Sequence, residues 1–105
     1  MDLGDLTIET AKTLVGTTFE IPLPDGRTTT LKLDEAVPFE HLQRRARRNP
    51  KIKRSPFSMF FLGPPSELLP QAMYTLRSET VTFDSIFLVP IDQDEEATEY
   101  EAVFT

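Results

Sequence analysis

The amino-acid sequence predicts an all-β fold, a mostly antiparallel sandwich or small barrel of about six strands with a short N-terminal helix. Apolar and polar residues alternate along residues 17–37, which is the period of half-buried strands. Dense apolar runs fill residues 56–105 and are separated by prolines, one glycine and acidic turns. Most connections between these runs are short, as in antiparallel sheets. With 105 residues, the chain is expected to form a single domain, 1–105, with a modest core.

The short helix is predicted at residues 7–15. Thr7 is suited to cap its N-terminus, although Thr10 stands where a complete capping box has Glu. Gly16 follows where a left-handed C-terminal cap belongs. Two turns are too short to be stable alone, so the helix is expected to pack on the sheet. Its apolar face is expected to consist of Ile8, Ala11, Leu14 and Val15.

A β-hairpin is predicted at residues 17–37, because both arms alternate with period two and the sequence PDGR at 24–27 favours a turn between them. Pro22 lies within the first arm and cannot donate a ladder hydrogen bond. That arm is therefore expected at a sheet edge, or Pro22 is expected to face outward at a bulge. The residues expected to face inward are Phe19, Ile21, Leu23, Leu31 and Leu33.

Residues 38–55 form a variable basic connection with two open interpretations. Pro38 can begin a helical turn or two that Pro50 ends. Alternatively, the segment is a long connection between strands, because its closely spaced arginines repel one another. This segment is the predicted partner-binding site, with the residues Arg44, Arg45, Arg47, Arg48, Lys51, Lys53 and Arg54.

The remaining strands are predicted in residues 56–105. The run PFSMFFL is apolar at both alternating sets of positions, which predicts a central strand covered on both faces. In the loop that follows, Leu68 and Leu69 are expected to tuck under the body. The strand VTFDSIFLVPI is expected to bend near Asp84 and Ser85, where the alternation breaks. The inward residues are expected to be Phe57, Met59, Phe61, Ala72, Tyr74, Leu76, Tyr100, Ala102 and Phe104.

Composition limits the classes of function. The chain has no Cys, which excludes disulfides, thiolate zinc sites and cysteine nucleophiles. No run approaches the roughly 18–20 apolar residues of a membrane helix, so no membrane partner is expected. The first ten residues, MDLGDLTIET, lack the pattern of a signal peptide. We therefore expect a cytoplasmic protein, or one that is exported or assembled without a cleaved signal peptide.

Charge is distributed very unevenly. Seven of the eleven basic residues lie between Arg44 and Arg54, which leaves four basic against seventeen acidic residues elsewhere. Outside the basic segment, the excess of acidic residues is expected to repel nucleic acid. The basic segment itself lacks the interleaved aromatic residues that stack on bases. The partner is therefore expected to be another protein or a further copy of this chain, and nucleic acid is disfavoured.

Candidate catalytic and metal sites are weak. His41 is the only histidine, and no GxSxG elbow accompanies it, so it is expected to face solvent. The acidic cluster at residues 92–101 begins like a calcium loop, but Ala97 replaces the required glycine and Val103 replaces the bidentate Glu. No glycine-rich phosphate loop is present among four glycines. We expect no enzymatic activity, no catalytic residues, no cofactor and no metal.

Three strings in the chain resemble one bacterial family: VGTTFEI, PFSMFFLGPPSELLPQAMYTL, and IFLVPI followed by YEAVFT. It is a family of small proteins catalogued only as a domain of unknown function, and the resemblance covers nearly the whole chain except residues 38–55. Genes of this family often neighbour genes for phage tail collar-type proteins. The resemblance therefore implies a structural or assembly role in a phage-tail-like or surface-fibre system, and it implies no catalytic residues. Ala72 departs from the family, which often has Gly there. The positions that recur in the family are Phe57, Gly63, Pro64, Leu69, Pro70, Tyr74 and Tyr100.

The function expected from the sequence is that of a non-enzymatic structural or interaction subunit. Binding is expected to use an exposed strand edge together with the basic segment. The alternative is a small-molecule-binding β-barrel in which the aromatic interior lines a cavity. A filled core is favoured over a cavity, because eight Phe in a chain of 105 residues supply large apolar side chains.

Overall fold

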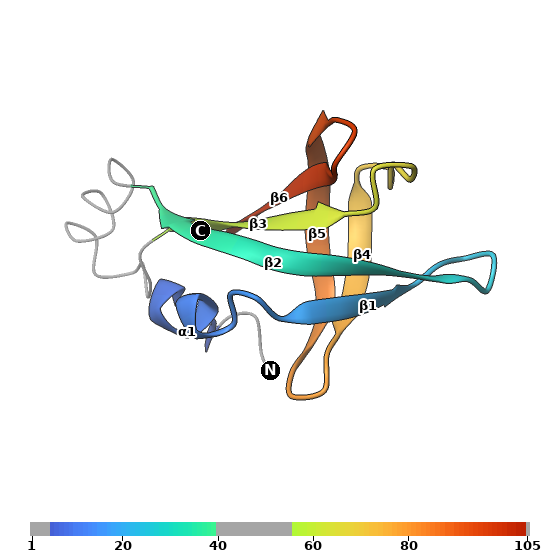
Figure 1. Ribbon diagram of the computed structural model, residues 1–105. Helices are drawn as coiled ribbons and strands as arrows, with labels where there is room; N and C mark the ends of the chain where they lie inside the picture. The colour runs from blue at the N-terminus through green and yellow to red at the C-terminus, as the bar shows by residue number, and fades with distance from the viewer. Residues whose placement is uncertain (1–4, 40–55, 105) are drawn as a thin grey trace.

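The computed structural model describes residues 5–39 and 56–104, which form a closed antiparallel barrel of six strands and one short helix (Figure 1). This confirms the predicted all-β fold with a short N-terminal helix, and it decides between sandwich and barrel. The elements are α1 (Ile8–Thr13), β1 (Thr18–Pro22), β2 (Thr28–Pro38), β3 (Phe57–Gly63), β4 (Ala72–Arg77), β5 (Thr82–Gln93) and β6 (Thr98–Phe104).

The barrel consists of two three-stranded meanders, β1–β2–β3 and β4–β5–β6, which meet at two seams. At the β3–β6 seam, every residue of β3 pairs with one of β6, from Phe57 opposite Phe104 to Gly63 opposite Thr98. At the β1–β4 seam, the register contains the single pair Glu20–Arg77. Figure 1 shows β1 and β4 crossing steeply, so the two strands diverge on either side of this pair. Closure of the barrel is therefore complete at one seam and minimal at the other.

The barrel interior is filled by apolar side chains from every strand. Phe19 stacks on Phe83 with ring centroids 5.3 Å apart and meets Phe61 edge-on at 6.1 Å. All three rings are fully buried, and such aromatic contacts add to the stability given by burial. The other fully buried large side chains are Tyr100, Phe57, Leu6, Ile21, Leu31, Leu33, Met59, Leu76 and Leu88.

Helix α1 begins as predicted and ends earlier than predicted. The side chain of Thr7 accepts the backbone N–H three residues later at 3.3 Å, which confirms the N-cap. Ile8 and Ala11 are buried, but Val15 is 44% exposed, so its placement on the apolar face is wrong. Gly16 has a φ of +94° and donates its N–H to a β2 carbonyl at 2.8 Å. This bond draws the chain onto β2 before another helical turn can form.

The predicted hairpin is formed by β1 and β2, which pair in register from Thr18–Lys32 to Pro22–Thr28. In the turn, Gly26 has a φ of +88°, a conformation that glycine adopts without strain. Pro22 is the exposed last residue of β1 and no bulge interrupts the β1–β2 register. Pro22 has no N–H to donate to β4. Because β1 pairs with β4 only at Glu20, this absence removes no hydrogen bond from the β1–β4 ladder.

The predicted bend in β5 is present as a bulge. Asp84 and Ser85 are both exposed, and they stand opposite the single residue Thr75 of β4. The Thr75 hydroxyl donates to the Asp84 carbonyl at 2.6 Å, which gives a backbone group at the bulge a partner. Two further bulges were not predicted: Asp34 is the extra residue in β2, and Ile91 is the extra residue in β5.

Two further predictions of burial are wrong. Strand β3 was expected to be covered on both faces, but its outward residues Phe60 and Leu62 are only half-buried. The reason is that a barrel has one interior, and Phe60 and Leu62 are not part of the buried core that fills it. In the β3–β4 loop, Leu69 is buried as predicted, whereas Leu68 is 55% exposed.

Candidate partner-binding groove

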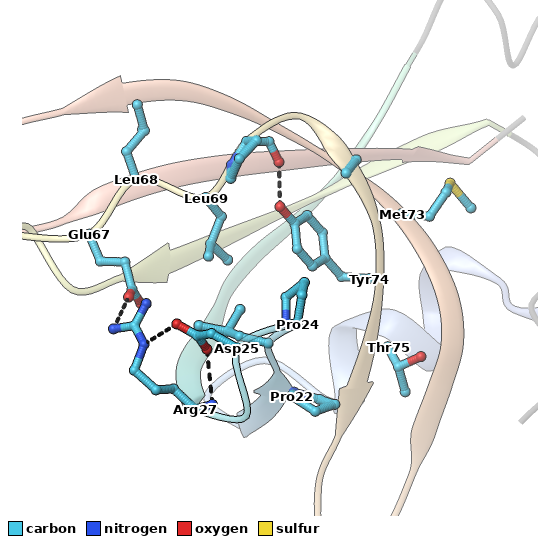
Figure 2. A pocket seen from close by; sticks show the side chains of 13 residues that line it. Pro22, Pro24, Asp25, Arg27, Glu67, Leu68, Leu69, Met73, Tyr74 and Thr75 are labelled. Carbon is cyan, nitrogen blue, oxygen red and sulfur yellow. Dashed lines mark hydrogen bonds and ion pairs between the residues drawn. The ribbon is translucent and has the colours of Figure 1, made fainter.

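A hollow lies at the β1–β4 seam, on one side of the Glu20–Arg77 pair. We call it the seam groove; it has a volume of about 810 Å³ and three walls. The walls are the end of β1 with the β1–β2 turn, the loop between β3 and β4, and the first half of β4 (Figure 2). Their residues lie in the ranges 22–27, 67–70 and 72–75.

The loop wall is anchored to the barrel by β6. The buried N–H of Leu69 donates to the Tyr100 hydroxyl at 2.8 Å, and this hydroxyl donates to the Glu67 carbonyl at 3.3 Å. The Thr98 hydroxyl lies within 3.0 Å of the Pro64 carbonyl and 3.2 Å of the Glu67 carbonyl. The interior side chains of Tyr100 and Thr98 therefore fix the position of this loop, which lies about thirty residues earlier in the chain. Burial raises the pKa of the Tyr100 hydroxyl, which stays protonated in this role.

The β4 wall carries Tyr74, which was predicted to face inward with Ala72 and Leu76. Leu76 is fully buried, but Ala72 and Tyr74 are only half-buried because they line the groove. The Tyr74 hydroxyl donates to the Pro70 carbonyl at 2.6 Å, as Figure 2 shows. Burial, with a smaller contribution from Tyr100, raises the pKa of Tyr74. The bond joins the β4 wall to the loop wall.

A charged cluster joins the turn wall to the loop wall. The Arg27 Nε lies 2.6 Å from Asp25 Oδ2, and the Arg27 Nη1 lies 3.3 Å from Glu67 Oε2. Asp25 also accepts the Arg27 backbone N–H at 3.0 Å. The side-chain hydrogen bond from Arg27 is the main cause that lowers the pKa of Asp25. Because Arg27 and Asp25 are exposed and Glu67 is only partly buried, the cluster adds little stability; its effect is to position two walls.

Most of the groove surface is apolar. The turn contributes Pro22, Leu23 and Pro24, and the loop contributes Leu68 beside Leu69 and Pro70. Leu68 and Met73 are both more than half exposed, although they are large apolar side chains. An open, apolar hollow with a few charged groups at one side is typical of a binding site, because a partner that fills it removes apolar surface from water.

A second hollow lies on the other side of the Glu20–Arg77 pair. Its volume is about 600 Å³ and it is lined by polar and charged residues, with hydroxyl groups from Thr17, Thr18, Thr30, Ser78 and Thr80. The β1–β4 seam is therefore open on both sides of its one residue pair. The seam groove is the stronger candidate for binding. The polar side chains of the second hollow are well hydrated in the free protein, and a partner that displaced this water would have to replace its hydrogen bonds.

The seven basic residues predicted to bind a partner lie outside the described residues, and so does His41. The structure describes only the two residues that flank this segment. The Phe39 N–H donates to the Pro56 carbonyl at 3.2 Å, just beyond the Pro38–Phe57 pair. The basic segment therefore joins the barrel at the end of β2 opposite to the β1–β2 turn, away from the seam groove.

The acidic cluster at 92–101 contains the β5–β6 turn. Asp94 accepts the N–H groups of Glu96 at 2.8 Å and Ala97 at 2.9 Å, and these bonds lower its pKa. Burial and the neighbouring carboxylates, Asp92 first among them, raise the pKa of Glu99. No group of three or more His, Cys, Asp or Glu within the described residues is placed to hold a metal ion. No helix within the described ranges has the length and apolar character required to cross a membrane.

The seam groove was not predicted from the sequence. Its walls come from three separate segments, and the Arg27–Glu67 bridge joins residues forty positions apart. The available signal was local: the sequences PLPDGR and PPSELLP combine prolines with leucines that no strand pattern explains. Such segments are typical of loops that carry binding residues.

Comparison with known proteins identifies a family. No curated protein and no solved structure matched the chain. One family model, described as a domain of unknown function (DUF6916), matches residues 6–104, from the residue before the Thr7 cap to the last residue of β6. The chain therefore belongs to the DUF6916 family.

Proposed function

We propose that this protein is a non-enzymatic interaction subunit that binds a protein partner in the seam groove. The observation that supports the proposal is an open, apolar groove on a barrel whose interior is filled. Three walls meet there and are held by specific bonds, from Tyr100, Tyr74 and Arg27. A groove held in shape before binding loses little entropy when a partner enters.

The finer proposal is a structural or assembly role in a phage-tail-like or surface-fibre system. Its support is the gene neighbourhood that the family resemblance implies. The basic residues between Arg44 and Arg54 are proposed as a second contact, because they oppose a strongly acidic body.

The alternative, a small-molecule-binding barrel with an aromatic-lined cavity, has less support. Phe19 contacts both Phe61 and Phe83, and all three side chains are fully buried. Neither of the two hollows at the seam is lined by these rings. A ligand in the interior would have to displace packed side chains, whereas the seam groove is open to solvent.

Affinity capture from the native host tests the proposal with matched variants. The groove variant is Leu68→Gln with Met73→Gln, which keeps size and removes apolar character at two exposed positions. The control is Val103→Gln, which is 51% exposed on β6 and outside the groove. We expect wild type and control to retain the same partner and the groove variant to lose it. Equal capture by all three proteins would contradict the proposal. A captured tail or fibre protein would support the finer role.

A further inference from the structure

We propose that the seam groove receives an extended, cationic segment of a protein partner, which pairs with β4 as an additional strand of the barrel sheet. The inference rests on the proposed function and names the chemistry and binding mode of the partner. It follows from the backbone of β4, from the shape of the groove and from the charge of the surface around it.

Strand β4 has one paired edge and one largely open edge. On the β5 side, its residues pair from Ala72–Leu88 to Arg77–Thr82. On the β1 side, the register of the described strands contains only Arg77, opposite Glu20. In an antiparallel ladder every second residue directs its N–H and C=O toward the same neighbour. About half of the backbone groups in Ala72–Leu76 therefore face the groove, where no strand pairs with them.

A closed barrel ordinarily removes its strand edges, and this one retains an edge because its closure rests on one residue pair. The opposite wall cannot complete the ladder. Pro22 and Pro24 have no N–H, and the chain between them turns away from β4 into the β1–β2 turn. Water reaches these backbone groups in the open groove. An extended peptide can replace that water, because its own donors and acceptors have the spacing of a strand.

The shape of the groove selects a single segment over a second folded barrel. The open edge of β4 spans five residues, which is about 17 Å at roughly 3.3 Å per residue. The β1–β2 turn and the Glu67–Pro70 loop stand beside this edge, bridged by Arg27 and Glu67 (Figure 2). Because these walls flank the edge, we expect it to be more accessible to one extended segment than to the edge of another barrel.

The chemistry of the partner follows from the walls and the charges. Pro22, Leu23 and Leu69 favour apolar side chains at alternate positions, because alternate side chains of an added strand face the same wall. The described residues include fifteen acidic and four basic side chains, so the surrounding field attracts a cationic segment. At the groove itself, Asp25 and Glu67 carry two negative charges and Arg27 carries one positive charge, so the cluster keeps a net negative charge.

The test begins with a displayed library of random nine-residue peptides, selected against the full-length protein and measured by fluorescence anisotropy. We expect the enriched peptides to carry Lys or Arg and to have apolar residues at alternate positions. The groove variant, Leu68→Gln with Met73→Gln, should bind them at least tenfold more weakly, and Val103→Gln should bind them like wild type. Enrichment of acidic peptides, or no enrichment at all, would overturn the inference.

Backbone N-methylation of the best peptide isolates the strand pairing. Methyl groups are placed on alternate residues in two registers, so that one set faces β4 and the other faces away. We expect one register to lose at least tenfold in affinity and the other to bind nearly as well as the parent peptide. Amide exchange within Ala72–Leu76 should slow at least tenfold on binding. Equal loss in both registers, or protection confined to other strands, would overturn strand addition.

Two further outcomes separate this inference from the proposed function. A captured native partner that needs Leu68 and Met73 but leaves β4 amide exchange unchanged would overturn strand addition and leave the proposed function standing. A partner that is indifferent to the groove variant would contradict the proposed function itself. Protection of β4 that rises with protein concentration alone would identify a second copy as the occupant and overturn the present inference.

Discussion

Replacing Tyr100 by Phe removes one hydroxyl group and leaves the barrel interior filled. In the wild type, this hydroxyl accepts the buried N–H of Leu69 at 2.8 Å and donates to the Glu67 carbonyl at 3.3 Å. The Glu67 carbonyl keeps a partner in the variant, because the Thr98 hydroxyl also contacts it, at 3.2 Å. The N–H of Leu69 loses its hydrogen-bond acceptor. The loss of stability should therefore be that of one unsatisfied buried donor.

An unsatisfied buried donor costs about 1–3 kcal/mol. The ring of Phe fills the same space as the ring of Tyr, so no cavity cost adds to this value. For a domain of this size, each kcal/mol lowers the melting temperature by roughly 4–8 °C. We expect Tyr100→Phe to melt roughly 4–24 °C below wild type, and we expect the loop between Pro64 and Pro70 to loosen.

The assay combines urea unfolding with amide exchange at Leu69, and Tyr74→Phe is the matched control. The Tyr74 hydroxyl donates to the Pro70 carbonyl in the same loop, but that bond is exposed to water. Water replaces the lost donor there, so the control should lose less than about 1 kcal/mol. The reasoning would be refuted if Tyr100→Phe unfolded like wild type, or if the two variants lost equal stability. Unchanged exchange at Leu69 would also contradict it.

Three further predictions concern other parts of the chain. Gly63→Ala should lower stability by about 1–3 kcal/mol in urea unfolding, because a Cβ there meets Leu31 Cδ2 at 2.5 Å in a filled core; an unchanged midpoint would show that Leu31 moves aside freely. Burial and nearby carboxylates raise the pKa of Glu99 above its ordinary value of 4.5, so its charge opposes folding above that pH. Glu99→Gln should therefore melt higher than wild type at pH 7, with the difference vanishing below pH 4.5, whereas a lower melting temperature at pH 7 would contradict this sign. Changing Arg44, Arg45, Arg47 and Arg48 together to Ser should leave the melting temperature near that of wild type and reduce partner binding or self-association at low salt. Pull-down and light scattering at two salt concentrations check this last prediction, and equal, salt-independent behaviour of the two proteins would refute it.

The sequence was informative wherever the relevant interaction is local. Alternation placed Phe19 and Ile21 inside, because period two is a property of the strand itself. The same rule located the bulge at Asp84 and Ser85, where two adjacent polar residues break the pattern. The N-cap at Thr7 was equally accessible, since it depends on four consecutive residues.

Features that depend on distant contacts could not be predicted. The pairing of β3 with β6 closes the barrel, and nothing in Phe57–Gly63 encodes which strand lies beside it. The seam groove likewise depends on bonds such as Tyr100 to Leu69, which joins residues 31 positions apart. The exposure of Leu68 also follows from the path of its loop, because composition treats Leu68 and Leu69 alike. The predicted basic binding segment lies outside the described residues and stays a prediction.

The unequal seams imply an order of events during folding. Within each meander, strands that follow one another in the sequence pair with each other, so these ladders can form before the seams between the meanders. The extensive β3–β6 seam then joins the two meanders, and we expect the single Glu20–Arg77 pair to form last. Substitutions at the β1–β4 seam should give φ-values near zero, and Phe61→Leu should give a clearly higher value. High φ-values at Arg77 would contradict this order.

A ligand that pairs with β4 would then slow the unfolding of the native protein and leave the rate of folding unchanged. It stabilises contacts that are absent from the transition state, so its effect falls on the unfolding rate. The bound protein would form its barrel as fast as the free protein and keep it for longer. For the proposed function as an interaction subunit, that kinetic resistance would matter more than the equilibrium stability of the isolated chain.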